Sequence, residues 1–328
     1  MADMVLHRNL AEDVMSRLGL PLDRGLLLVG AQGPDPLYFN VLSRSGVVSR
    51  ELADGLHEKN VDEAIRTMVL YAGRSGEVGL VSYVIGYLTH VALDRAIHPY
   101  IYHHSGNYDP KKPKFGHHRG LHLRFERRVD LQWIKRQTGK HPRLFPLLGR
   151  VLPREHIPDN LTDMMDAVFR DVYGVLDAGR LFKGGYRRMR AVTRLVSSDR
   201  FGLKRILYRF LDMFNRRHEL FLSDFSFASP HDDADYLNLS RHTWRHPVTG
   251  DASDASVDDL YKEALDDALS MIGAARPCLL EGRCDASALS FSDRSLNSGI
   301  SARDTRDMTF FSIYTESPLM RTKNEKQT

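Results

Sequence analysis

The segment VGLVSYVIGYLTHVALDRAIHPY, residues 78–100, combines the longest apolar run of the chain with three candidate metal-ligating side chains. The run is interrupted by His90 and followed by Asp94, so it is too short and too polar to span a membrane and predicts a buried helix. His90, Asp94 and His98 recur every four residues. On a helix such positions lie about 40° apart, so the three side chains share one face. Pro99 predicts that the helix ends at His98.

Helical periodicity extends over most of the chain and predicts an all-α fold. Strand-like alternation is confined to residues 221–227, a short and serine-rich segment. Prolines and clusters of Asn, Asp and Gly predict three loops, at residues 30–40, 105–115 and 229–256. The predicted helices cover residues 5–18, 61–73, 78–98, 120–137, 160–176, most of 186–214, and 257–272.

Composition predicts a soluble globular protein with one large domain. Of the 328 residues, 42% are apolar and 27% are charged, which is typical of such proteins. We expect a multi-helix domain over residues 1–300 and a disordered tail over residues 301–328, where the sequence is polar. The N-terminus lacks the basic start and apolar stretch of a secretory signal, which predicts a cytoplasmic location.

Several common functional motifs are absent from the sequence. The only cysteines, Cys278 and Cys284, lack the spacing of thiolate zinc sites. We expect two free thiols, with a small disulfide-closed loop as the alternative. No His-Glu-x-x-His, Glu-x-x-His, Gly-x-Ser-x-Gly or phosphate-binding Gly-Lys-Ser/Thr sequence occurs, and the one His-Asp pair, at 231–232, lies far from the histidine-rich region at 90–122. These absences argue against zincin proteases, ferritin-like di-iron proteins, α/β-hydrolases, Rossmann enzymes and kinases.

Charge is distributed unevenly along the chain. Residues 183–217 contain eleven Lys or Arg and two Asp, whereas residues 251–272 contain seven acidic residues and one Lys. Apolar and aromatic residues interleave the basic segment, so it is a candidate for peripheral contact with anionic lipid. The interpretation that we favour is a helix packed on the core with a solvated basic face. The adjoining acidic segment argues against specific nucleic-acid binding.

Histidines are concentrated in one part of the chain. Seven of the fifteen lie between residues 90 and 122, and His122 with Glu126 repeats the four-residue spacing on the next predicted helix. A histidine and an acidic residue four positions apart, taken alone, are typical of a solvated pair on the surface of a helix. Together, imidazoles and carboxylates from two neighbouring helices favour a divalent metal site between them. The other histidines of this region flank a loop and are expected to form an exposed rim: His103, His104, His117 and His118.

An ordered set of motifs resembles the zinc-dependent phospholipase C family of bacteria, whose superfamily includes the single-strand zinc nucleases. Residues 86–100, GYLTHVALDRAIHPY, resemble the core motif of the family, and residues 122–130, HLRFERRVD, resemble its His-x-x-x-Glu helix. Residues 30–35, GAQGPD, resemble its Gly-Ala-x-x-Pro-Asp segment, and His57 and His7 lie at suitable positions. The similarity covers roughly residues 1–130. Residues 236–244 are more weakly similar to an intracellular, largely uncharacterised branch of the family.

The resemblance implies an all-α fold around a cluster of two or three Zn²⁺ ions. One ion would be bound by Asp35, His57, His90 and Asp94, a second by His98, His122 and Glu126, and a third by Asp94 and His7. The implied activity is hydrolysis of a phosphodiester or phospholipid substrate by in-line attack of a zinc-bound hydroxide on phosphorus. Asp35 would orient or deprotonate the attacking water.

The sequence departs from the family pattern at two places. Secreted members complete the third site with an N-terminal tryptophan, whereas this chain begins Met-Ala-Asp-Met. A free amine, Asp3, or a weakened third site are the alternatives. Residues 107–115 also lengthen the spacing between His98 and His122, and this insertion would either form a lid over the pocket or shape the choice of substrate. Two other functions stay open: a single-strand nuclease-like phosphodiesterase and a non-catalytic helical metal-binding protein.

Overall fold

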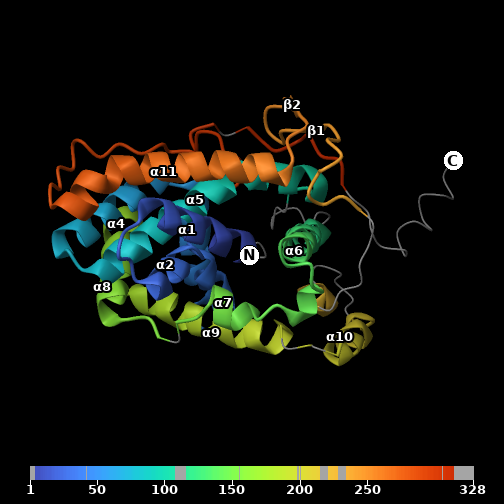
Figure 1. The fold of residues 1–328 in the computed structure, drawn as a ribbon. Helices are drawn as coiled ribbons and strands as arrows, with labels where there is room; N and C mark the ends of the chain where they lie inside the picture. The colour runs from blue at the N-terminus through green and yellow to red at the C-terminus, as the bar shows by residue number, and fades with distance from the viewer. Residues whose placement is uncertain are drawn as a thin grey trace.

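Two long helices, α5 (Val78–Ser105) and α11 (Val257–Glu281), lie side by side in this computed structural model (Figure 1). The structure describes residues 4–41, 43–107, 116–154, 156–197, 199, 201–214, 221–227, 234–304 and 306–313. Every residue of α5 from Leu80 to Ile101 is buried. A helix that is buried around its whole circumference must be enclosed by other elements, so α5 forms the centre of the core.

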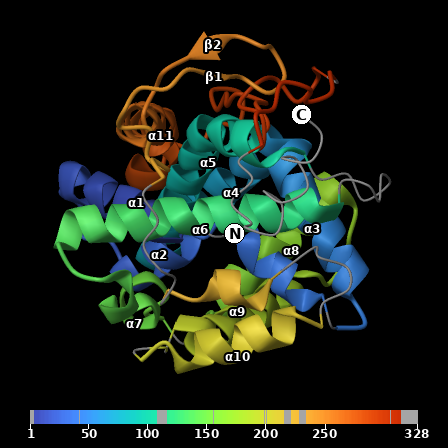
Figure 2. The ribbon, with the colours of Figure 1, turned by 90° about the vertical axis from the view of Figure 1, so that its right-hand side faces the viewer.

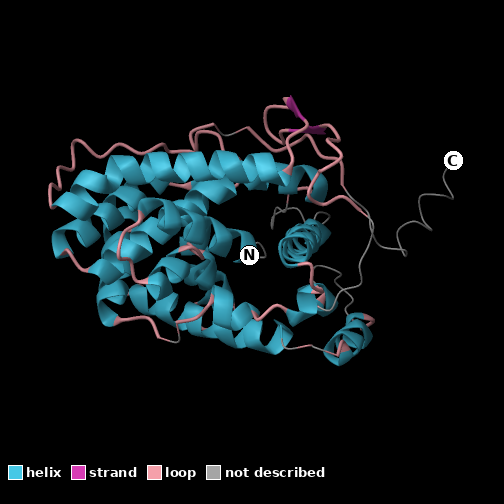
Figure 3. Cartoon of the chain, in the orientation of Figure 1, coloured by secondary structure: helices cyan, strands magenta, loops and turns pink. Residues whose placement is uncertain are grey.

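Further helices surround α5 and complete the all-α fold that the sequence predicts (Figure 3). Figure 2 shows α6 crossing the face on which α9 and α10 also lie. Two short strands, β1 (Trp244–Arg245) and β2 (Ala252–Ser253), pair antiparallel at the edge of the molecule. The remaining helices are α1 (Met4–Leu18), α2 (Arg24–Gly30), α3 (Gly46–Glu58), α4 (Val61–Ser75), α6 (Gly116–Thr138), α7 (Leu147–Val151), α8 (Asp159–Tyr173), α9 (Gly179–Ser197) and α10 (Leu203–Asp212), with 3-10 turns η1 (Asp35–Asn40), η3 (Pro142–Leu144) and η4 (Leu222–Phe225).

Reciprocal glycines bring the backbones of α2 and α5 into direct contact. A Cβ on Gly30 would lie 2.0 Å from the carbonyl oxygen of Tyr83, and a Cβ on Gly86 would lie 2.0 Å from that of Leu27. Neither contact is possible for a larger residue without displacing a helix. The segment after α2, which leads to Asp35, is thereby held against the middle of α5.

The predicted helix boundaries differ from the observed ones at several points. Helix α5 does not end at His98 but continues through Pro99 to Ser105, because the side chains of Tyr100 and Ile101 are buried in the core. Tertiary packing here outweighs the cost of a proline within a helix. The segment 221–227 forms the 3-10 turn η4 and not a strand, and helices α2 and α3 were not predicted.

Cys278 and Cys284 form a disulfide, so the expectation of free thiols is wrong and the alternative of a small closed loop is right. Helix α11 ends at Glu281, and Gly282, with φ +69°, reverses the chain so that Cys284 returns to Cys278. Gly73 of α4 leaves room for both sulfurs, since a Cβ there would lie 2.4 Å from one and 2.6 Å from the other.

Part of the tail that was expected to be disordered is packed on the domain. The N–H of Ser312 donates to the carbonyl of His103 (2.8 Å), and the N–H of Thr309 donates to that of Pro247 (2.8 Å). Residues 314–328 lie outside the described residues. None of the helices in the described part of the chain is long and apolar enough to cross a membrane.

Candidate metal centre

All eight predicted ligands meet at the inner face of α5, although they come from five different elements. Helix α5 provides three of them, and α1, η1 and α3 provide one each; α6 provides two. Seven are buried, and the His122 side chain is the most accessible, with 16% of its surface exposed. We call this set the cluster residues: His7, Asp35, His57, His90, Asp94, His98, His122 and Glu126.

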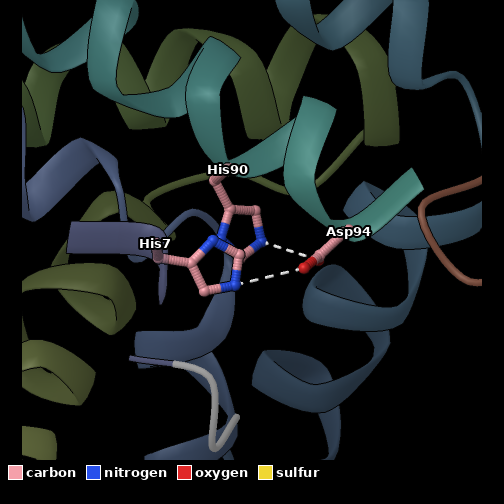
Figure 4. A group of neighbouring side chains, drawn as sticks. All are labelled: His7, His90 and Asp94. Atoms are coloured by element: carbon pink, nitrogen blue, oxygen red, sulfur yellow. Dashed lines mark ion pairs between the residues drawn. The ribbon is translucent and has the colours of Figure 1, made fainter. Parts of the chain in front are cut away.

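Asp94 lies at the centre of the cluster residues. Its Oδ2 is 3.0 Å from Nε2 of His90, and its Oδ1 is 3.2 Å from Nε2 of His7 (Figure 4). His57 and His98 also point Nε2 at this carboxylate, at 3.7 and 3.6 Å. Four imidazoles from three helices thus converge on one buried carboxylate.

Two more groups of ligand atoms extend the cluster on either side of Asp94. Asp35 and His57 form one group with His90, and Nε2 of His57 lies 3.7 Å from Oδ1 of Asp35. A Cβ on Gly33, whose φ is +49°, would lie 2.1 Å from the His90 ring, so this glycine is required for the close approach.

The other group combines His98 with two residues of α6. Nε2 of His122 lies 2.9 Å from Oε1 of Glu126, and Nε2 of His98 lies 3.6 Å from the same oxygen. His98 therefore faces both Asp94 and Glu126 and connects the two halves of the cluster. The ligand atoms within each of the three groups lie within 4.8 Å of one another, a spacing that allows them to share an ion.

Backbone carbonyls orient three of these rings through the nitrogen that faces away from the cluster. Nδ1 of His57 lies 2.8 Å from the carbonyl oxygen of Ala53, and Nδ1 of His90 lies 3.2 Å from that of Ala31. Nδ1 of His98 lies 2.9 Å from the carbonyl oxygen of Leu296. A carbonyl can only accept, so each Nδ1 carries the hydrogen. This arrangement directs the Nε2 lone pair inward and is typical of metal-bound histidine.

Several buried polar atoms of the cluster have no hydrogen-bond partner among the described residues. They include Nε2 of His90 and both carboxylate oxygens of Asp94, whose short contacts lack hydrogen-bond geometry. Unsatisfied polar atoms in a protein interior are costly. A divalent cation would satisfy all three atoms at once, so the residues present fit a metal.

The electrostatics of the cluster also fit a cation. Burial lowers the pKa of His7 and His57. Burial acts the same way on His90, but the Asp94 carboxylate outweighs it and raises the pKa of that imidazole. Although burial opposes ionisation of Asp94, His90 and His98 hold its pKa well below the usual range. The carboxylate is therefore ionised, and it attracts positive charge to its neighbours, whether carried by a proton or by a metal.

The rim of the cluster differs from the prediction. His103 and His118 are buried and not exposed, because Nδ1 of His103 contacts the carbonyl oxygen of Phe310 and Nδ1 of His118 contacts that of Asn107. His104 is partly buried and stacks on Phe125, with ring centroids 5.0 Å apart. None of these three belongs to a metal-ligand group among the described residues. The side chain of His117, Asp3 and most of the expected lid at 107–115 lie outside the described residues.

Sequence reasoning did not single out two tyrosines beside the cluster. The ring of Tyr102 lies 4.6 Å from that of His122, measured between centroids, and the ring of Tyr38 lies 5.6 Å from that of His57. Tyr102 follows His98 by one helical turn, so the same four-residue spacing that revealed the ligands extends to it. The position of Tyr38 beside His57 depends on the fold of the 3-10 turn η1, so no local spacing in the sequence indicated it.

Asp130, one helical turn after Glu126 on α6, connects the cluster residues to the start of α1. Its carboxylate is fully buried and accepts from the N–H groups of Val5 and Leu6, at 3.4 Å each, while Nη1 of Arg127 lies 3.9 Å away. Burial raises the pKa of Asp130 to about 7. The contact satisfies N–H groups at the first turn of α1 that have no partner within the helix, and so fixes the position of His7.

We expect Asp130→Ala to lower the free energy of unfolding by about 1–3 kcal/mol, because it leaves buried donors without an acceptor. It should also weaken metal binding at His7. The measurements are urea unfolding and metal content per chain. Asp130→Asn retains an acceptor in a side chain of the same size, so it should lose less stability and less metal than Asp130→Ala. Equal losses for the two variants would contradict this role for the carboxylate.

Comparison of the chain with protein-family models, with curated proteins and with solved structures found no match. The arrangement of the side chains is therefore the basis for assigning a function.

Proposed function

We propose that this protein is a zinc-dependent phosphodiester hydrolase of the phospholipase C type, with two or three Zn²⁺ ions bound by the cluster residues. The convergence of four Nε2 atoms on the buried carboxylate of Asp94 supports this proposal more than any other observation. Five imidazoles and three carboxylates are a ligand set that suits zinc. The similarity of residues 30–35, 86–100 and 122–130 to motifs of that family points to the same activity.

Three groups of ligands close together suit a reaction at phosphorus. Zinc, when bound, lowers the pKa of water to about 7 and neutralises charge on phosphate oxygens. Asp35 is buried beside His57 and His90, where its carboxylate can accept a proton from a water molecule and orient it. Asp94 holds the imidazoles of three helices in a fixed relation, so the ligands need little rearrangement during the reaction.

The accessibility of the ligands indicates the side from which substrate enters. His122 is more exposed than the other cluster residues, and Tyr102 packs against its ring. Helix α6, which carries His122, crosses an outer face of the molecule (Figure 2). We therefore assign the entrance to the α6 side of the cluster, where a phosphate group would meet His122 first.

Two measurements on the purified full-length chain test the proposal. The first is zinc per chain by plasma mass spectrometry, and we expect two or three. The second is hydrolysis of bis(p-nitrophenyl) phosphate, phosphatidylcholine vesicles and single-stranded DNA with the same preparation. Activity on the first two that is lost with a chelator and regained with zinc would support it.

Other outcomes would overturn the proposal in distinguishable ways. A chain that binds no zinc, even after zinc is added, has no metal centre. Stoichiometric zinc without hydrolysis of any phosphodiester would indicate a metal-binding protein that is not an enzyme. A marked preference for single-stranded DNA over the other substrates would indicate a nuclease.

A further inference from the structure

Helix α10 has an orientation opposite to that of an ordinary surface helix. Its apolar side chains share a face about 140° wide on a helical projection, and that face is turned to solvent. The exposed fractions are 67% for Ile206, 54% for Phe210 and 68% for Phe214. Apolar stripes of surface helices normally face the core. We call the exposed set the α10 apolar face: Leu203, Ile206, Leu207, Phe210 and Leu211 of α10, and Phe214 in the turn that follows the helix.

Hydrogen bonds on the inner side hold α10 in this orientation. Asp212 is buried and accepts from the N–H groups of Leu222 and Ser223, at 2.7 and 3.0 Å. At the start of the helix, the buried Asp199 accepts from the N–H of Arg205, at 2.8 Å. The polar side of the helix is thus tied to the domain, and rotation of α10 would break these bonds. The outward apolar face is a defined feature of the fold.

Cations border the α10 apolar face on both sides. On a helical projection Lys204 lies at one edge and Arg209 at the other. Nζ of Lys204 donates to the carbonyl oxygen of Leu195 at 2.8 Å, whereas Arg209 is exposed. Burial lowers the pKa of the Arg205 guanidinium, and Arg209 and Arg128 lower it further, while Asp224 and Asp199 act in the opposite direction. The combination is typical of a helix that lies in the headgroup region of a membrane, where the long cationic side chains extend to phosphates.

The charge of the molecule is also polarised. Helix α11 carries a run of acidic side chains, among them Asp259, Glu263 and Asp266, which are exposed. Helices α11 and α10 lie on opposite sides of the molecule (Figures 1 and 2). An anionic surface would attract the side with α10 and repel the side with α11, which selects one orientation.

We propose that the α10 apolar face inserts into the headgroup region of an anionic phospholipid bilayer and docks the protein there. The catalytic consequence rests on the function proposed above. Arg124 of α6 binds Asp224 of η4 at 2.9 Å, and η4 packs against α10, so the docking surface is joined to the helix that carries His122. A bilayer at α10 would lie on the side of the molecule to which we assign the substrate entrance.

The test is sedimentation of the full-length protein with phosphatidylcholine vesicles that contain 0 or 30% phosphatidylglycerol. We expect binding to the anionic vesicles that weakens as salt is raised. A variant with Phe210→Asp and Phe214→Asp should bind at least 10-fold more weakly. Both side chains are exposed, so the fold should tolerate the change, and circular dichroism checks this. Leu176→Asp, on a 69% exposed leucine outside α10, is the matched control and should bind like the parent.

Four results would overturn the docking proposal. The first two are a parent protein that does not bind anionic vesicles and a Phe210/Phe214 variant that binds them as well as the parent does. The third is self-association of the parent, seen by analytical ultracentrifugation, that the variant abolishes. The fourth is vesicle binding that single-stranded DNA prevents by occupying α10. The variant Asp94→Asn separates the two proposals, because it should lose metal but still sediment with vesicles. If the parent hydrolyses phosphodiesters and does not bind vesicles, only the docking proposal fails.

Discussion

Replacing Asp94 by asparagine is expected to remove at least one metal ion per chain and to lower phosphodiester hydrolysis by more than about 100-fold. Loss of a residue that only orients a ligand already costs about 10–100-fold. Asp94 has a larger role, since Nε2 atoms of four histidines lie within 3.7 Å of its carboxylate. An amide is neutral, has one acceptor oxygen, and would direct an N–H group at atoms that need a cation.

The effect of Asp94→Asn should be specific to the metal centre. We would measure zinc per chain, the rate of phosphodiester hydrolysis and the far-ultraviolet circular dichroism of the variant. Asp163→Asn is the matched control, because Asp163 is an exposed carboxylate on α8 and is not a cluster residue. It should retain parental metal content and rate. An Asp94→Asn protein that is folded, retains all its zinc and hydrolyses phosphodiesters at the parental rate would exclude the proposed centre.

Removal of the metal should destabilise the protein more than any surface substitution. A ligand that binds only the folded state stabilises it by about 4 kcal/mol per site when free ligand exceeds the dissociation constant a thousandfold. With two sites occupied, a chelator is expected to lower the melting temperature by roughly 10 °C or more. The structural reason is that removal of the metal would leave the carboxylate of Asp94 buried without a compensating cation.

Calorimetry or circular dichroism with EDTA, followed by dialysis and a zinc titration, measures this effect. Added zinc should restore the melting temperature, whereas added magnesium should not, because imidazole-rich sites favour zinc. The response to zinc should be smaller for Asp94→Asn. Equal melting temperatures for the metal-free and zinc-loaded protein would show that the cluster does not bind zinc under these conditions.

The histidine-rich centre was predictable from the sequence because its main motif is local. His90, Asp94 and His98 share one face of any helix that contains them, and the same holds for His122 and Glu126. The predicted helices likewise followed from apolar periodicity. Helices α2 and α3 were missed because a short helix beside prolines and glycines carries little periodic signal. The end of α5 was misplaced because the rule for proline considers only local geometry.

Contacts between distant residues account for what the sequence analysis missed. His103 was expected to be exposed, and it is buried because residues about 200 positions later in the chain, around Phe310, pack over it. The disulfide depended on the reversal of the chain at Gly282. The orientation of α10 follows from the bonds that Asp212 and Asp199 make, and no periodicity reveals that an apolar face is turned outward.

The sequence by itself determined the helical class, the grouping of His90, Asp94 and His98 on one face, and the pairing of His122 with Glu126. Those features depend on backbone hydrogen bonding within a few residues, which has the same geometry in every helix. Only the tertiary structure decided that His7, Asp35 and His57 meet this face, and that the carbonyl of Leu296 orients His98. Such contacts depend on which helices can approach closely, as Gly30 and Gly86 allow, and close packing is a property of the whole chain.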